Sequence, residues 1–221
     1  MNGFKEIYRR NLPHWQPQDS IFFITFRLAH SLPQSILHEL RAEQERERQS
    51  ICARLRGEEQ RVELYNSAKK FFGKYDAWLD QCIEESPRWL AQENIARLVM
   101  QEIHRLDAMR YHLFAFCIMP NHVHLLIDTT GFSQVSPTNA AGTTRPYPLT
   151  DSLRLLKGRT ARYCNQAMGR AGDFWHHESY DHVMRDEQEF GRIFRYILDN
   201  PVKAQLVSTL ENWPFTYAGR D

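Results

Sequence analysis

The chain has 221 residues, of which 42% are hydrophobic and 25% charged, and these values are ordinary for a globular protein with a sizeable core. Its 28 basic and 27 acidic side chains leave a net charge of +1, which excludes a chain-wide basic coat that binds nucleic acid indiscriminately. An anionic partner must therefore meet a local basic patch. The longest apolar stretches, residues 21–26 and 113–119, are far shorter than the roughly 20 residues of a membrane span.

The N-terminal residues and the cysteines indicate a cytoplasmic protein. Arg9 and Arg10 are followed by Leu-Pro-His-Trp rather than by an apolar core, so no secretory signal is expected. The four cysteines are widely spaced and form no Cys-x-x-Cys pair, which argues against a structural zinc site. Reduced thiols in a cytoplasmic protein, with no membrane partner, are the simplest interpretation.

The first half of the chain reads as one strand followed by helices. A run rich in β-branched and aromatic residues predicts a strand over residues 21–26. Charge alternation and apolar spacing then predict helices over 34–56, 57–72, 75–83 and 92–106.

The second half alternates strands and helices. Two strands, 111–118 and 121–128, flank Met119-Pro120. After a segment rich in Thr, Ser, Gly and Pro come a helix over 152–168, a strand over 179–185 and a helix over 187–198 that Asn200-Pro201 stop.

This order of elements predicts an α+β protein: a mostly antiparallel sheet with helices packed on one face. We expect a single domain over residues 1–221. It carries a helical insertion at about 34–108 and a flexible loop at about 129–149.

The most informative pattern is a pair of histidines on a predicted strand. His122 and His124 are two residues apart, so their side chains share one face, while Val123, Leu125 and Ile127 point into the other layer. Two imidazoles at this spacing can hold one divalent metal ion and leave several coordination positions open for chemistry. The same spacing also fits two histidines that merely fill a surface or a core.

A second pattern lies on the last predicted helix. Tyr196 and Asn200 are four residues apart and therefore lie on one helix face. The Tyr196 phenol is a candidate covalent nucleophile, and the Asn200 carbonyl oxygen is an acceptable ligand for a hard cation. The alternative is that Tyr196 packs in the core while Asn200 ends the helix before Pro201.

A third pattern is a basic helix, since the stretch from Leu153 to Arg170 contains no acid. Its bases are Arg154, Lys157, Arg159, Arg162 and Arg170. In a chain of nearly zero net charge, this concentration suits a phosphate backbone. A solvated basic face is the other interpretation.

Two motifs together carry a resemblance to a known family. They are Met119-Pro120-Asn121-His122-Val123-His124 and Tyr196-Ile197-Leu198-Asp199-Asn200-Pro201-Val202-Lys203. With them the chain resembles the single-tyrosine HUH transposases (His, hydrophobic residue, His), and most of all the REP-associated tyrosine transposases of bacterial chromosomes. Shorter stretches are similar in the same order: 12–15, 23–28, 174–175, 180–182, 185–187 and 213–215. The resemblance spans nearly the whole chain and is weakest over 34–75 and 129–149.

The resemblance implies a ferredoxin-like sheet, with the histidine pair on a central strand and the tyrosine on a helix opposite. By motif position, His122 and His124 bind the metal, Tyr196 is the nucleophile and Asn200 is the third protein ligand. Relatives outside this subgroup carry glutamine where Asn200 stands, and glycine is common where Gln205 stands.

The activity that the resemblance implies is that of a transposase: metal-dependent cleavage and strand transfer of single-stranded DNA through a 5′-phosphotyrosine intermediate. The expected cofactor is Mg²⁺ or Mn²⁺. The expected partner is single-stranded or hairpin DNA of repetitive extragenic palindromes, so the protein is nucleoid-associated when bound to DNA. Whether it acts as a monomer or a homodimer stays open.

Candidate DNA contacts follow from this expectation. Arg154, Lys157, Arg159 and Arg162 are the expected phosphate contacts. Trp175, Phe174 and Trp15 are candidate stacking platforms, although aromatic rings are more often buried. His182 is the best DNA-contact candidate of the cluster His176, His177, Glu178 and His182.

Two other functions stay open at this point. A catalytically inactive relative would bind DNA hairpins as a regulator, although the intact set of His122, His124, Tyr196 and Asn200 argues against decay. A His-x-His metallohydrolase acting on a small molecule would need further ligands, for which only the 176–182 cluster offers suitable residues.

Overall fold

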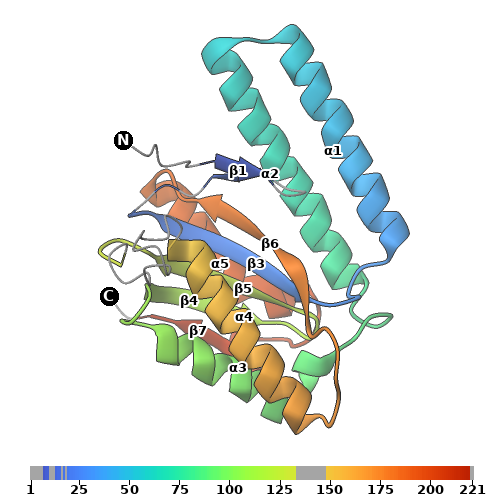
Figure 1. The fold of residues 1–221 in the computed structure, drawn as a ribbon, viewed down its shortest axis with the longest axis vertical. Coiled ribbons are helices and arrows are strands. Elements are labelled where there is room, and N and C mark those ends of the chain that lie inside the picture. The colour runs from blue at the N-terminus through green and yellow to red at the C-terminus, as the bar shows by residue number, and fades with distance from the viewer. Residues whose placement is uncertain (1–6, 10–12, 16, 18, 133–147, 220–221) are drawn as a thin grey trace, which may run out of the picture. The chain divides into compact units, whose positions relative to one another are not determined.

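A computed structural model describes residues 7–9, 13–15, 17, 19–132 and 148–219 (Figure 1). The chain forms two compact units. We call them the sheet unit, within residues 1–29 and 89–221, and the helical unit, residues 30–88. None of the described helices combines the length and apolar character that crossing a bilayer requires.

The sheet unit is built on five antiparallel strands. Their spatial order is β6, β3, β5, β4 and β7. These strands are β3 (Ile21–Leu28), β4 (His112–Ile118), β5 (His122–Asp128), β6 (Trp175–Val183) and β7 (Thr216–Ala218). Short strands β1 (Ile7–Arg9) and β2 (Pro13–Trp15), which were not predicted, pair with each other. Strand β5, which carries the two histidines, is therefore the central strand, between β3 and β4.

The helices of the sheet unit lie on both faces of the sheet. On one face, Ile24, Val123 and Leu125 enter a core with apolar residues of α3 (Glu93–Leu106) and α4 (Pro148–Ala167). On the other face lies α5 (Glu187–Lys203), which is behind the sheet in Figure 1, whereas α4 is in front. The α+β class and the antiparallel sheet are as predicted. The helices were expected on one face, and α5 instead adds a second layer opposite α3 and α4.

The predicted insertion at about 34–108 divides between the two units. The helical unit contains only α1 (Gln34–Arg54) and α2 (Gly57–Gln81), and α2 joins the two helices expected at 57–72 and 75–83. The 3₁₀ turn Trp89–Ala91 and α3 belong to the sheet unit, because Ile95, Val99 and Ile103 of α3 are part of its core. Of the loop expected at about 129–149, residues 133–147 lie outside the described residues.

Helix α5 begins as predicted and ends later. The Asp186 carboxylate accepts a hydrogen bond from the Glu189 N–H (2.7 Å), a side-chain N-cap. The helix continues through Pro201 to Lys203, because a proline in the last turn removes only one backbone hydrogen bond. The Leu206 N–H then bonds to the Pro201 carbonyl, and Gln205 adopts a positive φ of 57°. This is the left-handed C-terminal position at which glycine is preferred.

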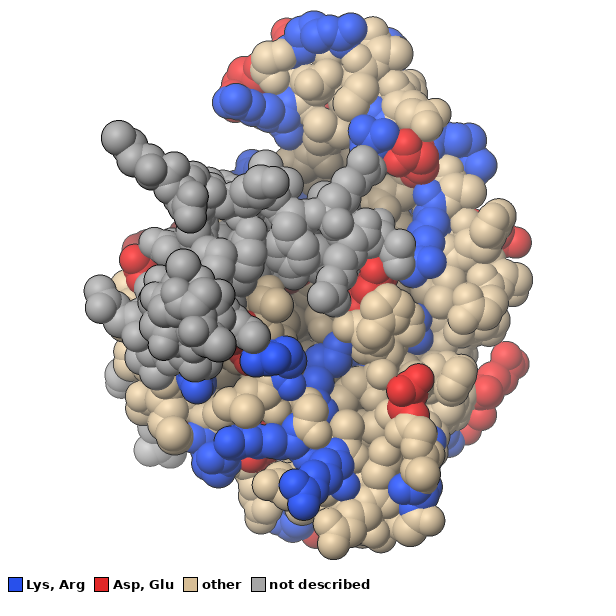
Figure 2. Space-filling view, viewed as in Figure 1, with Lys and Arg blue, Asp and Glu red and all other residues tan. Residues whose placement is uncertain are grey.

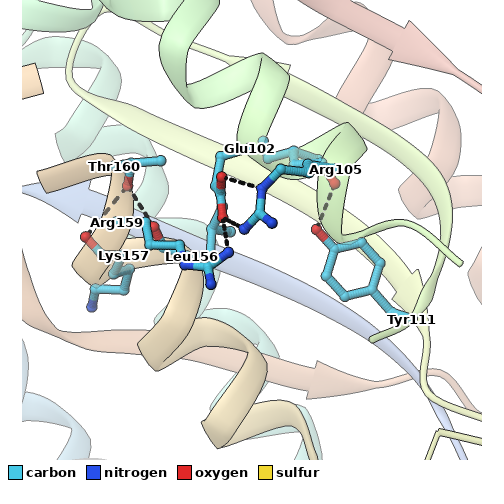
Figure 3. Close-up of polar contacts among 8 residues, drawn as sticks. Glu102, Arg105, Tyr111, Leu156, Lys157, Arg159 and Thr160 are labelled. Carbon is cyan, nitrogen blue, oxygen red and sulfur yellow. Dashed lines mark hydrogen bonds and ion pairs between the residues drawn. The ribbon is translucent and has the colours of Figure 1, made fainter. Parts of the chain in front are cut away.

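A buried carboxylate joins α3 to α4 (Figure 3). Glu102 is 4% exposed and accepts two hydrogen bonds from Arg105, at 2.5 and 2.8 Å. Its Oε1 also lies 3.3 Å from Arg159 Nη1 of α4. The pKa of Arg105 is raised by its hydrogen bonds with Glu102. Arg159 therefore has a structural partner within the sheet unit.

We expect Glu102→Ala to lower the free energy of unfolding by about 1–3 kcal/mol, because two guanidinium groups lose a buried acceptor. Urea unfolding measures this loss. The control is Glu93→Ala, which removes an exposed ion pair with Arg97 and should change stability by less than about 0.5 kcal/mol. Equal losses in the two variants would contradict the structural role of Glu102.

Candidate functional site

Antiparallel pairing of β3 with β5 places both histidines of the motif on the face that α5 covers. His122 is paired with Arg27 and His124 with Thr25, and directly paired residues project to the same side of a sheet. The intervening Val123 enters the core on the opposite face, as predicted. Both imidazoles are fully buried, and their Nε2 atoms are 3.0 Å apart.

Each imidazole is anchored through its other ring nitrogen. His122 Nδ1 donates to the side-chain oxygen of Asn121 (2.7 Å), which can only accept. His122 Nε2 therefore carries a lone pair. His124 Nδ1 is hydrogen-bonded to the Thr25 hydroxyl (2.8 Å), which can act as donor or acceptor. The Thr25 hydroxyl thus accommodates either tautomer of His124.

The buried environment keeps both histidines neutral. Burial lowers the pKa of His122 to about 3. Burial and, to a lesser degree, the neighbouring His122 lower the pKa of His124 well below its ordinary value. At neutral pH both side chains are therefore uncharged, the form in which imidazole binds metals.

The ring of Phe23 links the histidines to the tyrosine of α5. It stacks on His124, with centroids 5.6 Å apart, and meets the edge of Tyr196 at 6.2 Å. The Tyr196 and His124 ring centroids are themselves 5.5 Å apart. The structure thus brings together the two motifs that are distant in sequence, with the half-buried phenol beside the imidazole pair.

Asn200 follows Tyr196 by one helical turn on the same side of α5. Its side chain is 1% exposed, and its Oδ1 atom accepts no hydrogen bond from any residue that the structure describes. A buried carbonyl oxygen without a donor costs about 1–3 kcal/mol, so a compensating partner is expected. A cation is such a partner.

These donors fit a divalent ion. Two neighbouring ligands of an octahedral ion, each at about 2.1 Å, are about 3.0 Å apart, which is the separation of the two Nε2 atoms. Two imidazole nitrogens with anchored Nδ1 atoms leave the other positions of the ion to oxygen ligands, a combination suited to Mn²⁺ and also to Mg²⁺.

The basic residues of α4 lie on the opposite side of the sheet from this site. Basic side chains gather over α3 and α4 in Figure 2. Lys157 Nζ donates to the backbone oxygens of His176 (2.7 Å) and His177 (3.1 Å), and Arg159 pairs with Glu102. Arg154 lies 3.7 Å from Asp151, while Arg162 is exposed. The DNA contacts predicted on α4 are therefore not next to the histidines, and three of the four have partners within the protein.

The predicted stacking residues are in the core. Trp175 is 7% exposed, packs edge-on against Phe26 (4.8 Å) and donates its indole N–H to the Thr160 hydroxyl (2.9 Å). Phe174 is also buried. Neither ring is available for base stacking, because both are buried and the indole N–H of Trp175 already has an acceptor inside the protein. The side chain of Trp15 lies outside the described residues.

His182 has a structural partner on α5. Its Nε2 lies 3.2 Å from Glu189 Oε1, and both side chains are largely buried. Glu189 Oε2 also accepts from the Arg185 N–H (3.2 Å). This contact fixes the start of α5 against β6, two turns before Tyr196.

The run 176–182 does not offer the ligand set that a metallohydrolase needs. Within the described residues, no three metal-binding side chains of this run lie close enough to share an ion. His176 Nδ1 instead accepts the Glu178 N–H (3.3 Å), and burial is the main cause that lowers its pKa to about 3.

Sequence reasoning assigned no role to Asn121, Thr25 and Phe23, which orient the two imidazoles and the phenol. All three lie within the stretches that resemble the family. Thr25 and Phe23 also alternate along one strand, which places them on one face. The alternation does not predict which strand pairs with β3 or in which register. That pairing is what brings both residues to His124.

Comparisons with known proteins give relatives in both sequence and structure. The chain is 27% identical over 112 residues to a Haemophilus influenzae protein named for the REP-associated tyrosine transposases, covering 50% of this chain and 61% of that protein. It is 29% identical over 97 residues to an uncharacterised protein of the same organism, covering 39% of this chain and 52% of that protein. The chain thus spans somewhat over half the length of these curated relatives. No family model matches the chain.

A solved structure has a similar fold. It is described as a REP-associated tyrosine transposase bound to a REP hairpin, and it is 16% identical to this chain with a TM-score of 0.50. The similarity covers 95% of this chain and 80% of that one. At this identity the match concerns the fold. The resemblance of this chain to the REP-associated tyrosine transposases is thereby confirmed, in sequence over half its length and in fold over nearly all of it.

Proposed function

We propose that this protein is a divalent-metal-dependent endonuclease and strand transferase that acts on single-stranded or hairpin DNA through a 5′-phosphotyrosine intermediate. One observation carries the proposal: the Tyr196 ring lies 5.5 Å from His124, whose Nε2 is 3.0 Å from that of His122. A nucleophile and a pair of neutral metal ligands, contributed by motifs far apart in sequence, meet on one face of the sheet. The sequence relatives named above support the assignment to transposition.

In this proposal Tyr196 is the nucleophile. Its Oη atom attacks the scissile phosphorus in line, forms the Oη–P bond and displaces the 3′ oxygen of the strand. The phenol proton leaves to solvent and the 3′ oxygen takes up a proton, so no net charge is created. Because the phosphodiester energy is retained in the tyrosyl ester, a second 3′-hydroxyl can displace Tyr196 and join new ends.

The other residues hold the metal and keep it oriented. His122, His124 and Asn200 would be the protein ligands, and Asn121 and Thr25 fix the two imidazoles. When bound, Mg²⁺ or Mn²⁺ supplies charge neutralisation at a non-bridging phosphate oxygen. Phe23 holds the phenol and the His124 imidazole in one packed group, which limits the orientations open to the nucleophile.

The first test concerns metal binding without DNA. We expect Thr25→Val to weaken Mn²⁺ binding about 10–100-fold, because His124 loses the partner that orients it, while Thr25→Ser retains the wild-type affinity. Isothermal titration of the metal-free protein measures this effect. Unchanged affinity in Thr25→Val, or no binding by the wild-type protein, would contradict the metal site.

The second test concerns the covalent step. Wild-type protein incubated with single-stranded hairpin DNA and Mn²⁺ should form a protein–DNA adduct that survives denaturation, and Tyr196→Phe should form none. The matched control is Tyr180→Phe, since Tyr180 also contacts Phe23 on this face of the sheet but lies outside the motif of residues 196–203. Adduct formation by Tyr196→Phe would show that the nucleophile is another residue. DNA binding by the wild type without any adduct would support the inactive regulator instead.

A further inference from the structure

The basic surface nearest the candidate nucleophile is on α5 rather than on α4. At about 100° per residue around a helix, Arg192 and Lys203 lie only about 40° and 20° from Tyr196, on the same side of it. Arg192 precedes the tyrosine by about one turn and Lys203 follows it by about two turns. Tyr196 thus stands between two bases along one line of the helix, which we call the α5 stripe (Arg192, Tyr196 and Lys203).

Contacts and exposure support a role of this stripe in binding an anion. Lys203 Nζ lies 5.0 Å from the centre of the Tyr196 ring, so its charge is at the candidate site itself. Arg192 and Lys203 are both exposed, and neither forms an ion pair with any carboxylate that the structure describes. The bases of α4 differ in this respect, because Arg159 and Arg154 have carboxylate neighbours.

The buried side of α5 confirms that the stripe borders solvent. Ile197, Asn200 and Glu189 are buried, and Glu189 Oε1 lies 3.2 Å from His182 Nε2 on the sheet side of the helix. Asp199 is half-buried and lies about 60° from Tyr196, on the same side of it as Arg192 and Lys203. It provides a means of testing the sign of the electrostatic effect.

We propose that the α5 stripe binds the phosphate backbone of the single strand on both sides of the phosphate that Tyr196 attacks. This inference rests on the proposed function for the identity of the anion, a polyphosphodiester strand. Two cations flanking the nucleophile would hold the strand along the helix and keep the scissile phosphate beside the phenol. The contacts are to phosphates, so they position the strand without reading its sequence.

The test measures how DNA affinity depends on salt. A fluorescent single-stranded hairpin with unpaired ends is titrated with the full chain in EDTA, which prevents cleavage, at several salt concentrations. For single strands each phosphate contact contributes about 0.7 to the slope of log affinity against log salt. We expect Arg192→Met and Lys203→Met each to reduce the slope by about that amount, and Arg192→Lys and Lys203→Arg to restore it.

Controls on the same and on another helix separate the stripe from general charge. Arg195→Met removes an exposed base of α5 about 100° from Tyr196, and Arg97→Met removes one from α3; both should leave the slope within error of wild type. Asp199→Asn should strengthen binding. The inference is overturned if the stripe variants and the controls lose the same slope, or if none of them changes it.

The outcome is independent of catalysis. The wild type could form no tyrosyl adduct while the stripe variants still show a smaller salt dependence of DNA affinity. In that case the stripe is a DNA-binding surface and the proposed reaction is wrong. If the adduct forms and the stripe variants bind like Arg195→Met, the reaction stands and the stripe inference fails. Thermal unfolding of each variant verifies that the substitution leaves the fold intact.

Discussion

The antiparallel pairing of β3 with β5 is the constraint on which the candidate site depends. Its register sets Thr25 opposite His124, so a hydroxyl reaches one imidazole while the strands bury their apolar residues on the other face. A shift by one residue would turn the histidines into the apolar core and the apolar residues toward α5. Burial of the core therefore specifies the register, and the register specifies the orientation of the two imidazoles.

Helix α5 adds Tyr196, the proposed nucleophile, to this face through contacts at both of its ends. The His182–Glu189 pair and the Asp186 cap fix its start, while the bond from the Leu206 N–H to the Pro201 carbonyl closes its end. Between them, the Tyr196 ring packs against Phe23 and His124. The candidate nucleophile and the imidazole pair are thereby held in one packed group.

Local sequence patterns correctly predicted the structural features that depend only on residues close together in the chain. The alternation of His122, Val123 and His124 gave the correct faces, and Asp186 correctly marked the start of α5. The predicted end of α5 was wrong because Pro201 was assumed to stop the helix, although a last-turn proline is tolerated.

The basic helix α4 was placed correctly as a helix, but composition does not show which face of the sheet a helix covers or that Glu102 already pairs with Arg159. Burial of Trp175 had been weighed as the commoner state of aromatic rings, but its hydrogen-bond partner could not be predicted, because Thr160 is on another element.

The central claim is that one divalent ion binds between the two imidazoles and lies beside the Tyr196 ring. Paramagnetic broadening by Mn²⁺ in protein with ¹³C-labelled tyrosine rings tests it directly, because the effect falls steeply with distance. The Tyr196 signals, assigned by their loss in Tyr196→Phe, should disappear early in the titration, whereas those of Tyr217, stacked on Phe116, should stay sharp. If the ion binds and the Tyr196 signals persist as sharply as those of Tyr217, the phenol does not lie beside the metal and the account is wrong.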